Sequence, residues 1–287
     1  MCIRDSTEIS DFPNHPFKVR MDAAMQEMTE SVKQYGVLVP ALVRPKPEGG
    51  YEMVAGHRRK KAADLAGLTE IPCIVRQLTD DEATIIMVDS NLQREQILPS
   101  EKAFAYKMKL DALKRQGQRT DLTSSPLDNK LKGVTAAQQI SRDSGDSQPQ
   151  IYRYIRLTHL IPEILELVDN SVLKDQEMLQ IAMRPAVELS YLDESQQRAF
   201  LEAMNDTQNA PSLSQAQQLK KMAQQGEFSY EKAFDVMGQE KRSEKDTVTI
   251  KNETLRKYFP RSYTPKQMEE KIIQLLDCLL YTSDAAD

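Results

Sequence analysis

Val54-Ala55-Gly56-His57-Arg58-Arg59-Lys60-Lys61-Ala62-Ala63 is the stretch that decides the fold of the first part of this chain. It follows the short apolar run 51–54 and leads into a helix-like segment that stops at Gly67. The pattern predicts a strand, a tight turn at Gly56 and then a helix. A helix N-terminus carries unpaired N–H groups and the positive end of the helix dipole, so four cations there are unfavourable unless an anion binds among them.

The residue types in this turn suit a phosphate group. Gly56 has no Cβ and lets the backbone approach an anion closely. Arg58 and Arg59 carry planar forks of N–H donors that match phosphate oxygens, and Lys60 and Lys61 add point charges. A solvated basic face would have the same residues, and the residues alone favour the two interpretations equally.

The flanking residues predict an α+β domain. An amphipathic helix over residues 22–35 ends at Gly36. Apolar runs at 41–44, 51–54 and 71–76 predict three strands, the first two joined as a hairpin. A further helix starts at Thr79 or Asp80 and ends in a polar segment with Asn91 and Arg94.

The middle of the chain predicts an all-α part. A helix that begins at Pro99-Ser100 carries Phe104, Met108 and Ala112 on one face, and residues 118–132 read as a loop. Helical periodicity then continues over 135–144, 147–160, 161–168, 178–192, 196–204 and 212–225.

Two of these helices, separated by Gly145-Asp146, have the spacing of a helix-turn-helix. Ile140 should pack against Ile151 and against Tyr154 or Ile155. The side chains left to contact DNA are Gln148, Gln150, Tyr152, Arg153 and Arg156. Pattern alone favours an ordinary helical hairpin equally.

Composition sets limits on the class of protein. In 287 residues with a net charge of −5, no apolar run is long enough to cross a membrane, and no secretory signal can be recognised. Three scattered cysteines do not make a disulfide framework or a zinc site. We therefore expect a cytoplasmic protein with no membrane partner.

The predicted organisation has three parts. Residues 7–98 form the α+β domain, residues 99–226 the helical DNA-binding domain, and residues 246–279 a small C-terminal module with a strand at 247–250 and a helix at 265–279. The last helix carries an apolar stripe of Met268, Ile272, Leu275 and Leu276, a candidate dimer interface. Residues 1–6 and 280–287 resemble translated sequencing adapters, and we expect them to be artefacts.

Three blocks of sequence together resemble ParB-type (ParB/RepB-like) partition proteins of chromosomes, plasmids and mobile elements. They are Gly36-Val37-Leu38-Val39-Pro40 with Val43-Arg44, the run from Tyr51 to Arg59 with Leu65-Ala66-Gly67-Leu68, and Asn91-Leu92-Gln93-Arg94-Glu95 before the helix that starts near Ser100. The resemblance implies a ParB/sulfiredoxin-like first domain, CTP and Mg²⁺ as cofactors, a centromere-like DNA site, a ParA-like ATPase partner and a homodimer. It also implies that the protein is nucleoid-associated.

The resemblance also implies roles for individual residues. Gly56, His57, Arg58 and Arg59 would hold the triphosphate, Gly36 would line the nucleotide pocket, and Arg94 would contact phosphate. Asn91 would serve both nucleotide and metal. The family has glutamate at the positions of His57 and Ser90, and because Mg²⁺ prefers carboxylates, hydrolysis of CTP is left open. Asp89 is a poor substitute, since one residue along a helix turns a side chain by about 100°.

Two alternatives belong to other classes. The first is a helix-turn-helix transcription regulator of a mobile element that uses no nucleotide. The second is an enzyme of the sulfiredoxin-like fold, whose Gly-Cys-His-Arg motif resembles Gly56-His57-Arg58. That enzyme would lack its nucleophile, because Gly56 occupies the cysteine position and Cys73 lies on a predicted buried strand.

Overall fold

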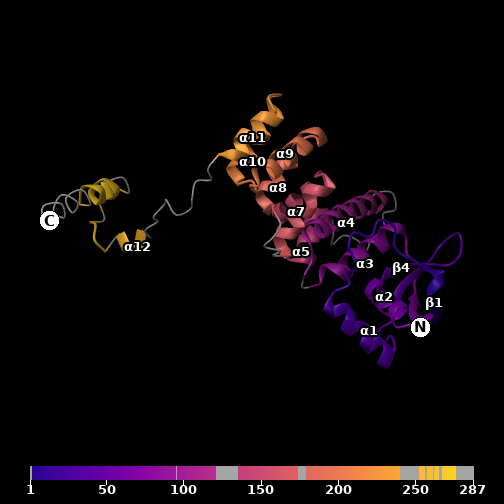
Figure 1. Cartoon of the computed structure of the whole chain (residues 1–287). Coiled ribbons are helices and arrows are strands. Elements are labelled where there is room, and N and C mark those ends of the chain that lie inside the picture. Colours follow the sequence, from indigo (N-terminus) through magenta and orange to yellow (C-terminus); the bar gives the residue numbers. More distant parts are fainter. Residues whose placement is uncertain are drawn as a thin grey trace. The chain divides into compact units, whose positions relative to one another are not determined.

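The computed structural model describes residues 2–94, 96–120, 135–173, 179–239, 252–255, 257–260, 262–264 and 267–275. The chain divides into two compact units, Met1–Gln239 and Glu240–Asp287 (Figure 1). The first unit holds the sheet and helices α1 to α11, and the second holds α12 (Asn252–Leu255) and a helical segment at 267–275. The strand predicted at 247–250 lies outside the described residues, as do residues 280–287.

A mixed five-stranded sheet forms the start of the first unit, with the order β1-β5-β3-β4-β2. Its antiparallel centre is the predicted hairpin, in which Val43 pairs with Met53, and β5 joins β3 in parallel with Cys73 beside Ala41. The strands are β1 (Cys2–Asp5), β2 (Ile9–Ser10), β3 (Ala41–Pro45), β4 (Tyr51–Ala55) and β5 (Glu70–Val75).

Three helices accompany this sheet: α1 (Ala23–Tyr35), α2 (His57–Leu65) and α3 (Asp80–Leu92), while a short 3₁₀ turn covers Ser6–Glu8. Asp22 caps α1 by accepting from the Met25 N–H, and Thr79 and Glu82 form a capping box at α3. One apolar core packs α1 and α2 on the sheet, and a second packs α3 near Val54.

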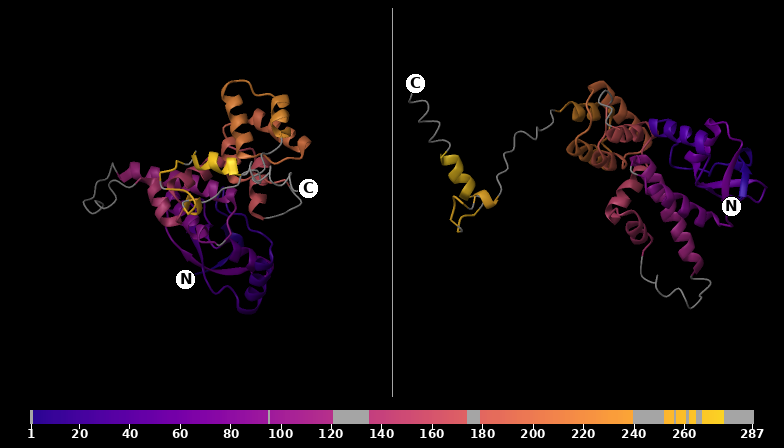
Figure 2. Two further views of the ribbon diagram at one scale, coloured as in Figure 1. Left: turned by 90° about the vertical axis from the view of Figure 1, so that its left-hand side faces the viewer. Right: turned by 90° about the horizontal axis from the view of Figure 1, so that it is seen from below.

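The long helix α4 (Pro99–Thr120) connects this sheet region to the helices that follow, because it contacts α3 on one side and α5, α6 and α7 further along (Figures 1 and 2). The following helices are α5 (Ala136–Ser144), α6 (Gln148–Leu157), α7 (Pro162–Leu173), α8 (Met183–Leu189), α9 (Glu194–Thr207), α10 (Leu213–Gln224) and α11 (Tyr230–Gly238).

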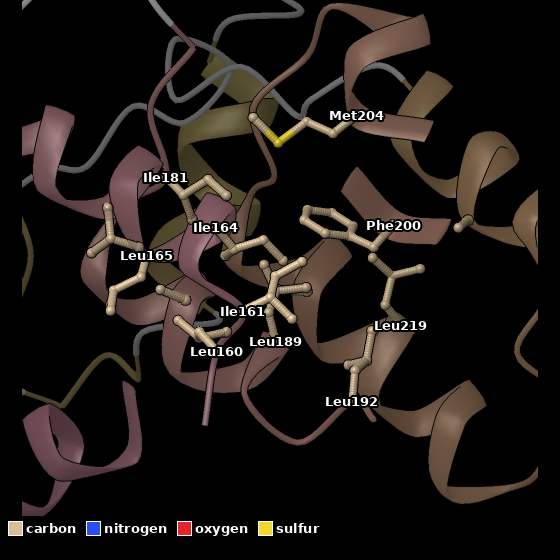
Figure 3. Close-up of a cluster of buried hydrophobic side chains, with 14 of the residues drawn as sticks. Leu160, Ile161, Ile164, Leu165, Ile181, Leu189, Leu192, Phe200, Met204 and Leu219 are labelled. Atoms are coloured by element: carbon tan, nitrogen blue, oxygen red, sulfur yellow. The ribbon is translucent and has the colours of Figure 1, made fainter. Parts of the chain in front are cut away.

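The largest apolar core lies among α6 to α11 (Figure 3). Phe200 and Ile164 are fully buried there, and Leu189 and Leu219 lie close to them. Burial of side chains of this size is worth about 1.5–3 kcal/mol each, so this core holds the second half of the unit together. No helix in the described part of the chain is long and apolar enough to cross a membrane.

The predicted order of an α+β region followed by helices is confirmed, with four differences in detail. Of the apolar face expected on α4, Ala112 is fully buried and Met108 partly buried, whereas Phe104 is 41% exposed. Because α4 has neighbours on several sides, its buried residues also include Tyr106 and Lys109. The helical part continues through α11, beyond the expected end at 226. In the C-terminal unit Met268 is buried but Leu275 is 55% exposed.

The fourth difference concerns the N-terminal end. Residues 2–5 form β1, an edge strand that pairs with β5 in antiparallel fashion. The Ser6 hydroxyl donates to the Asp64 carboxylate at 2.6 Å. Strand pairing does not reveal the origin of a segment, so the artefactual origin of residues 1–6 stays a prediction.

Candidate functional site

The turn at Gly56 has the geometry that the sequence predicted. Gly56 is the N-cap of α2 with φ of 117°, a region that favours glycine, and no side chain caps the helix start. A Cβ at this position would lie 3.0 Å from the Cβ of Ala41 on β3. The strand β4 therefore passes close to β3 before the chain enters α2, which fixes where the cations of α2 begin.

A cation-rich cavity of about 670 Å³ lies beside this turn. Arg58 from α2 and Arg94 from just after α3 both line it, although the two residues are far apart in sequence. Lys18 and Arg20, on the segment before α1, add two further positive charges. Two carboxylates, Asp22 and Glu101, also line the cavity, so cations outnumber anions there by four to two.

Arg58 and Arg94 are held in place by neighbouring groups. The Arg58 guanidinium contacts the Asp22 carboxylate at 3.3 Å, and its Nε is buried without a hydrogen-bond partner among the described residues. The Arg94 guanidinium lies over the Phe17 ring, 5.5 Å from the centroid. Burial lowers the pKa of Arg94. An arginine with unused N–H donors beside a cavity is suited to bind an anion.

Arg59 has a different environment from its neighbour. It donates through Nη1 to the carbonyls of Val39 and Pro40, at 2.6 and 2.7 Å. Arg59 therefore links α2 to the segment that follows Gly36. Burial lowers the pKa of the Arg59 guanidinium. Gly36 itself has φ of 70° and ends α1. A role for Arg59 and Gly36 in nucleotide binding stays a prediction.

His57 forms an imidazole pair that sequence reasoning did not anticipate. It is 7% exposed, and its ring lies 4.0 Å from the ring of His15. The Nδ1 of His15 is 2.8 Å from the Phe17 carbonyl. Because a carbonyl only accepts, this Nδ1 carries the proton. Burial, together with positive charge from His15 and two nearby cations, lowers the pKa of His57 to about 3. His57 is therefore neutral at pH 7.

The amide nitrogen of Asn91, the residue expected to bind metal, is engaged within α3 itself. Asn91 is 4% exposed and donates to the Met87 carbonyl at 2.7 Å. Ser90 donates to the same carbonyl. Asp89 forms an ion pair with Lys109 at 2.5 Å, in keeping with the expectation that it points away from the site. No group of three or more potential metal-ligating side chains occurs among the residues that the structure describes.

The helix pair α5–α6 packs as its apolar spacing predicted. Ile140 and Ile151 are fully buried in one cluster, with Tyr154 and Ile155 partly buried against it. Gly145 has φ of 76° and ends α5 in the left-handed conformation that glycine adopts readily. The predicted packing is therefore confirmed, and a DNA-binding role for this helix pair stays a prediction.

The five side chains proposed to contact DNA divide into two groups. Tyr152 is 53% exposed, Arg153 is exposed and lies 3.4 Å from the Gln150 oxygen, and Gln148 is half-buried in the first turn. Arg156 is instead engaged: it donates to the Ser190 hydroxyl and carbonyl, at 3.0 and 2.8 Å.

Arg156 thus links α6 to the end of α8 through hydrogen bonds. Its guanidinium lies 4.0 Å from the Tyr191 ring centroid, and Lys220 covers the same ring at 3.7 Å. Both cations are attracted to the electron-rich face of that ring. Sequence reasoning also missed Arg184, which lines a hollow of about 550 Å³ with Gln150 and Arg153. A basic residue near the start of α8 was the only sequence signal for it.

Cys73 is fully buried on β5 and donates to the Ile71 carbonyl at 3.6 Å. A thiol enclosed in an apolar core is poorly suited to act as a nucleophile, because burial disfavours the thiolate. The structure thus agrees with the interpretation of Cys73 as a core residue.

Comparison with known proteins relates the first part of the chain to one family. Residues 5–92 match the model of the ParB N-terminal domain family. The chain is similar to ParB and Spo0J partition proteins, such as "Stage 0 sporulation protein J" from Bacillus subtilis, 36% identical over 172 residues that cover 59% of this chain and 54% of the relative. The chain spans about half the length of the curated relatives it matches first.

Two solved structures of C-terminally truncated ParB from Caulobacter crescentus are also similar. The one complexed to the centromeric parS site covers 83% of this chain and 98% of that chain, with 22% identity and a TM-score of 0.41. The one complexed with CTP-gamma-S covers 66% of this chain and 96% of that chain, with 26% identity and a TM-score of 0.31.

Proposed function

We propose that this protein is a sequence-specific DNA-binding partition protein that binds CTP and acts in the segregation of a chromosome, plasmid or mobile element. The observation that carries the proposal is the cavity in which Arg58 and Arg94 meet Lys18 and Arg20. Lys18, Arg20 and Arg58 lie within the residues that match the ParB N-terminal domain, and Arg94 follows two residues after the end of that match. Relatives of this chain are named chromosome-partitioning proteins.

The cavity supports the nucleotide part of the proposal by its charge. Four cations surround a space large enough for a small ligand. Guanidinium groups pair with phosphate oxygens through two parallel N–H donors. The resemblance of the three sequence blocks to the family indicates CTP as the nucleotide. Triphosphate oxygens would contact Arg58 and Arg94, while Arg59 would hold the loop at Val39 and Pro40.

Arg58→Ala combined with Arg94→Ala should reduce the affinity for CTP by at least about a hundredfold, because each lost charge-assisted contact costs about 1.5–3 kcal/mol. Isothermal titration calorimetry of the full chain measures this. The control, Arg198→Ala with Lys232→Ala, also removes two positive charges, at exposed positions on α9 and α11, and should bind CTP like the wild type. Equal affinity in the site variant and the control would exclude this cavity as the nucleotide site.

The exposed side of α6 supports the DNA part of the proposal. Gln148 and Gln150 lie in its first turn, where glutamine can pair with adenine through two hydrogen bonds. Arg153 lies one turn further along, and Arg184 extends the same basic hollow. Arg156 would contribute by fixing α6 against Ser190, with one end of its guanidinium left for a phosphate.

Gln150→Ala should lower discrimination at one base pair by about 1–3 kcal/mol, whereas Arg153→Ala should weaken all sequences alike and reduce the salt slope by about one unit. Binding assays with a DNA site selected from a randomised library measure both effects at several salt concentrations. Arg198→Ala, remote on α9, is the control. Four variants at Gln148, Gln150, Arg153 and Arg184 that all bind like the wild type would show that α6 is structural.

The remaining expected partners follow from this proposal. A homodimer would read two half-sites of the DNA, and a ParA-like ATPase would act on the complex. The alternative, a helix-turn-helix regulator without a nucleotide, predicts the same DNA contacts but no CTP binding. Titration of the protein with CTP, with and without its DNA site, therefore distinguishes the two functions.

A further inference from the structure

We infer that this protein binds its nucleoside triphosphate without Mg²⁺, with side-chain cations taking the place of the metal. The inference rests on the proposed function, since it concerns how the same cavity neutralises the phosphates. Mg²⁺ in phosphate sites is usually held by one or two carboxylates together with the phosphate oxygens and water. A Mg²⁺ site in this cavity would therefore need at least one carboxylate that the fold leaves available.

The two carboxylates that line the cavity are already used by the fold. Glu101 is 4% exposed and accepts from the N–H of Lys18 through one oxygen and from the N–H of Leu98 through the other, at 2.9 and 3.0 Å. Asp22 accepts from the Met25 N–H at 2.9 Å as the cap of α1. The same Asp22 oxygen contacts Arg58 at 3.3 Å. Both carboxylates therefore position backbone and arginine.

The side chains at the positions where the family would hold the metal are equally unsuited to binding Mg²⁺. His57 is a neutral imidazole, and nitrogen is a poor ligand for Mg²⁺. The Ser90 hydroxyl and the Asn91 amide nitrogen both donate to the Met87 carbonyl. Asp89, the nearest carboxylate in sequence, is bound to the fully buried Lys109. The residues present thus do not fit a resident Mg²⁺.

The positively charged side chains of the cavity fit binding of the triphosphate without Mg²⁺. Lys18, Arg20, Arg58 and Arg94 exceed the two carboxylates by two positive charges, so the cavity favours an anion, and its side-chain cations can neutralise phosphate charge. Arg58 has a buried Nε donor without a partner in the described part of the chain. A triphosphate would supply acceptors for this donor and for the unused donors of Arg94. A triphosphate bound without metal would therefore satisfy these donors and have its charge balanced by side chains.

The test is calorimetric titration of the full chain with CTP in two buffers, one with MgCl₂ and one with EDTA. The affinity in EDTA should be within about threefold of the affinity in Mg²⁺, or tighter, a difference well below the roughly 1.4 kcal/mol of a tenfold change. Arg94→Gln should weaken binding by the same factor in both buffers. Circular dichroism checks that the variant is folded.

The outcomes separate the two proposals. An affinity that falls by about a hundredfold or more in EDTA would overturn metal-free binding and leave CTP binding intact. A loss in Arg94→Gln that Mg²⁺ restores would also overturn it, because the metal would then be able to replace the arginine. Absence of CTP binding in both buffers would overturn the proposed nucleotide function, and this inference with it.

Discussion

Lys109→Ala should lower the free energy of unfolding by about 3 kcal/mol, among the largest effects of a single substitution in this chain. Lys109 is fully buried on α4, and its ammonium contacts Asp89 of α3 at 2.5 Å and Asp143 of α5 at 2.6 Å. Alanine leaves a cavity where the lysine stem was packed. It also leaves two carboxylates facing each other without the cation that held them.

The two carboxylates make a controlled test possible. The triple variant Lys109→Met, Asp89→Asn and Asp143→Asn keeps the buried volume and removes all three charges, and it should unfold within about 1 kcal/mol of the wild type. Urea unfolding followed by far-ultraviolet circular dichroism is suitable, because the chain has no tryptophan. An unfolding curve for Lys109→Ala that coincides with that of the wild type would show that Lys109 contributes nothing to the link between α3 and α5.

The features that could be predicted from the sequence are local ones. The turn at Gly56 follows from a glycine between an apolar run and a helical run, and Ile140 and Ile151 reveal their packing through their spacing around Gly145. In both cases the residues that interact lie within about a dozen positions of one another. The strand order, with β5 beside β3, needed the three-dimensional structure.

The site residues that were missed depend on contacts between distant segments. Lys18 and Arg20 look like ordinary surface cations until the segment before α1 is placed beside Arg58 and Arg94. Lys109 is buried only because α3 and α5 both pack on α4. The same holds for Arg156: its hydrogen bonds to Ser190 span 34 positions, so its sequence neighbours gave no sign that its guanidinium was engaged.

Gly56→Ala should also lower the free energy of unfolding by about 3 kcal/mol. Two costs combine at this position. With φ of 117°, an L-residue is held in a region that side chains rarely adopt, and the new Cβ would lie 3.0 Å from the Cβ and 3.2 Å from the Cα of Ala41. Neither atom is the flexible end of a side chain, so β3 or the start of α2 must move.

Gly67→Ala separates these two costs, because Gly67 has φ of 78° but no atom within 4 Å of the added Cβ. It should cost only about 1 kcal/mol, from backbone strain alone. If contact with Ala41 causes the additional loss, Ala41→Gly should be less destabilising in the Gly56→Ala protein than in the wild type, a coupling that a double-mutant cycle measures. Equal losses for Gly56→Ala and Gly67→Ala, with no coupling to Ala41, would mean that the close approach of β3 to the start of α2 does not constrain this turn.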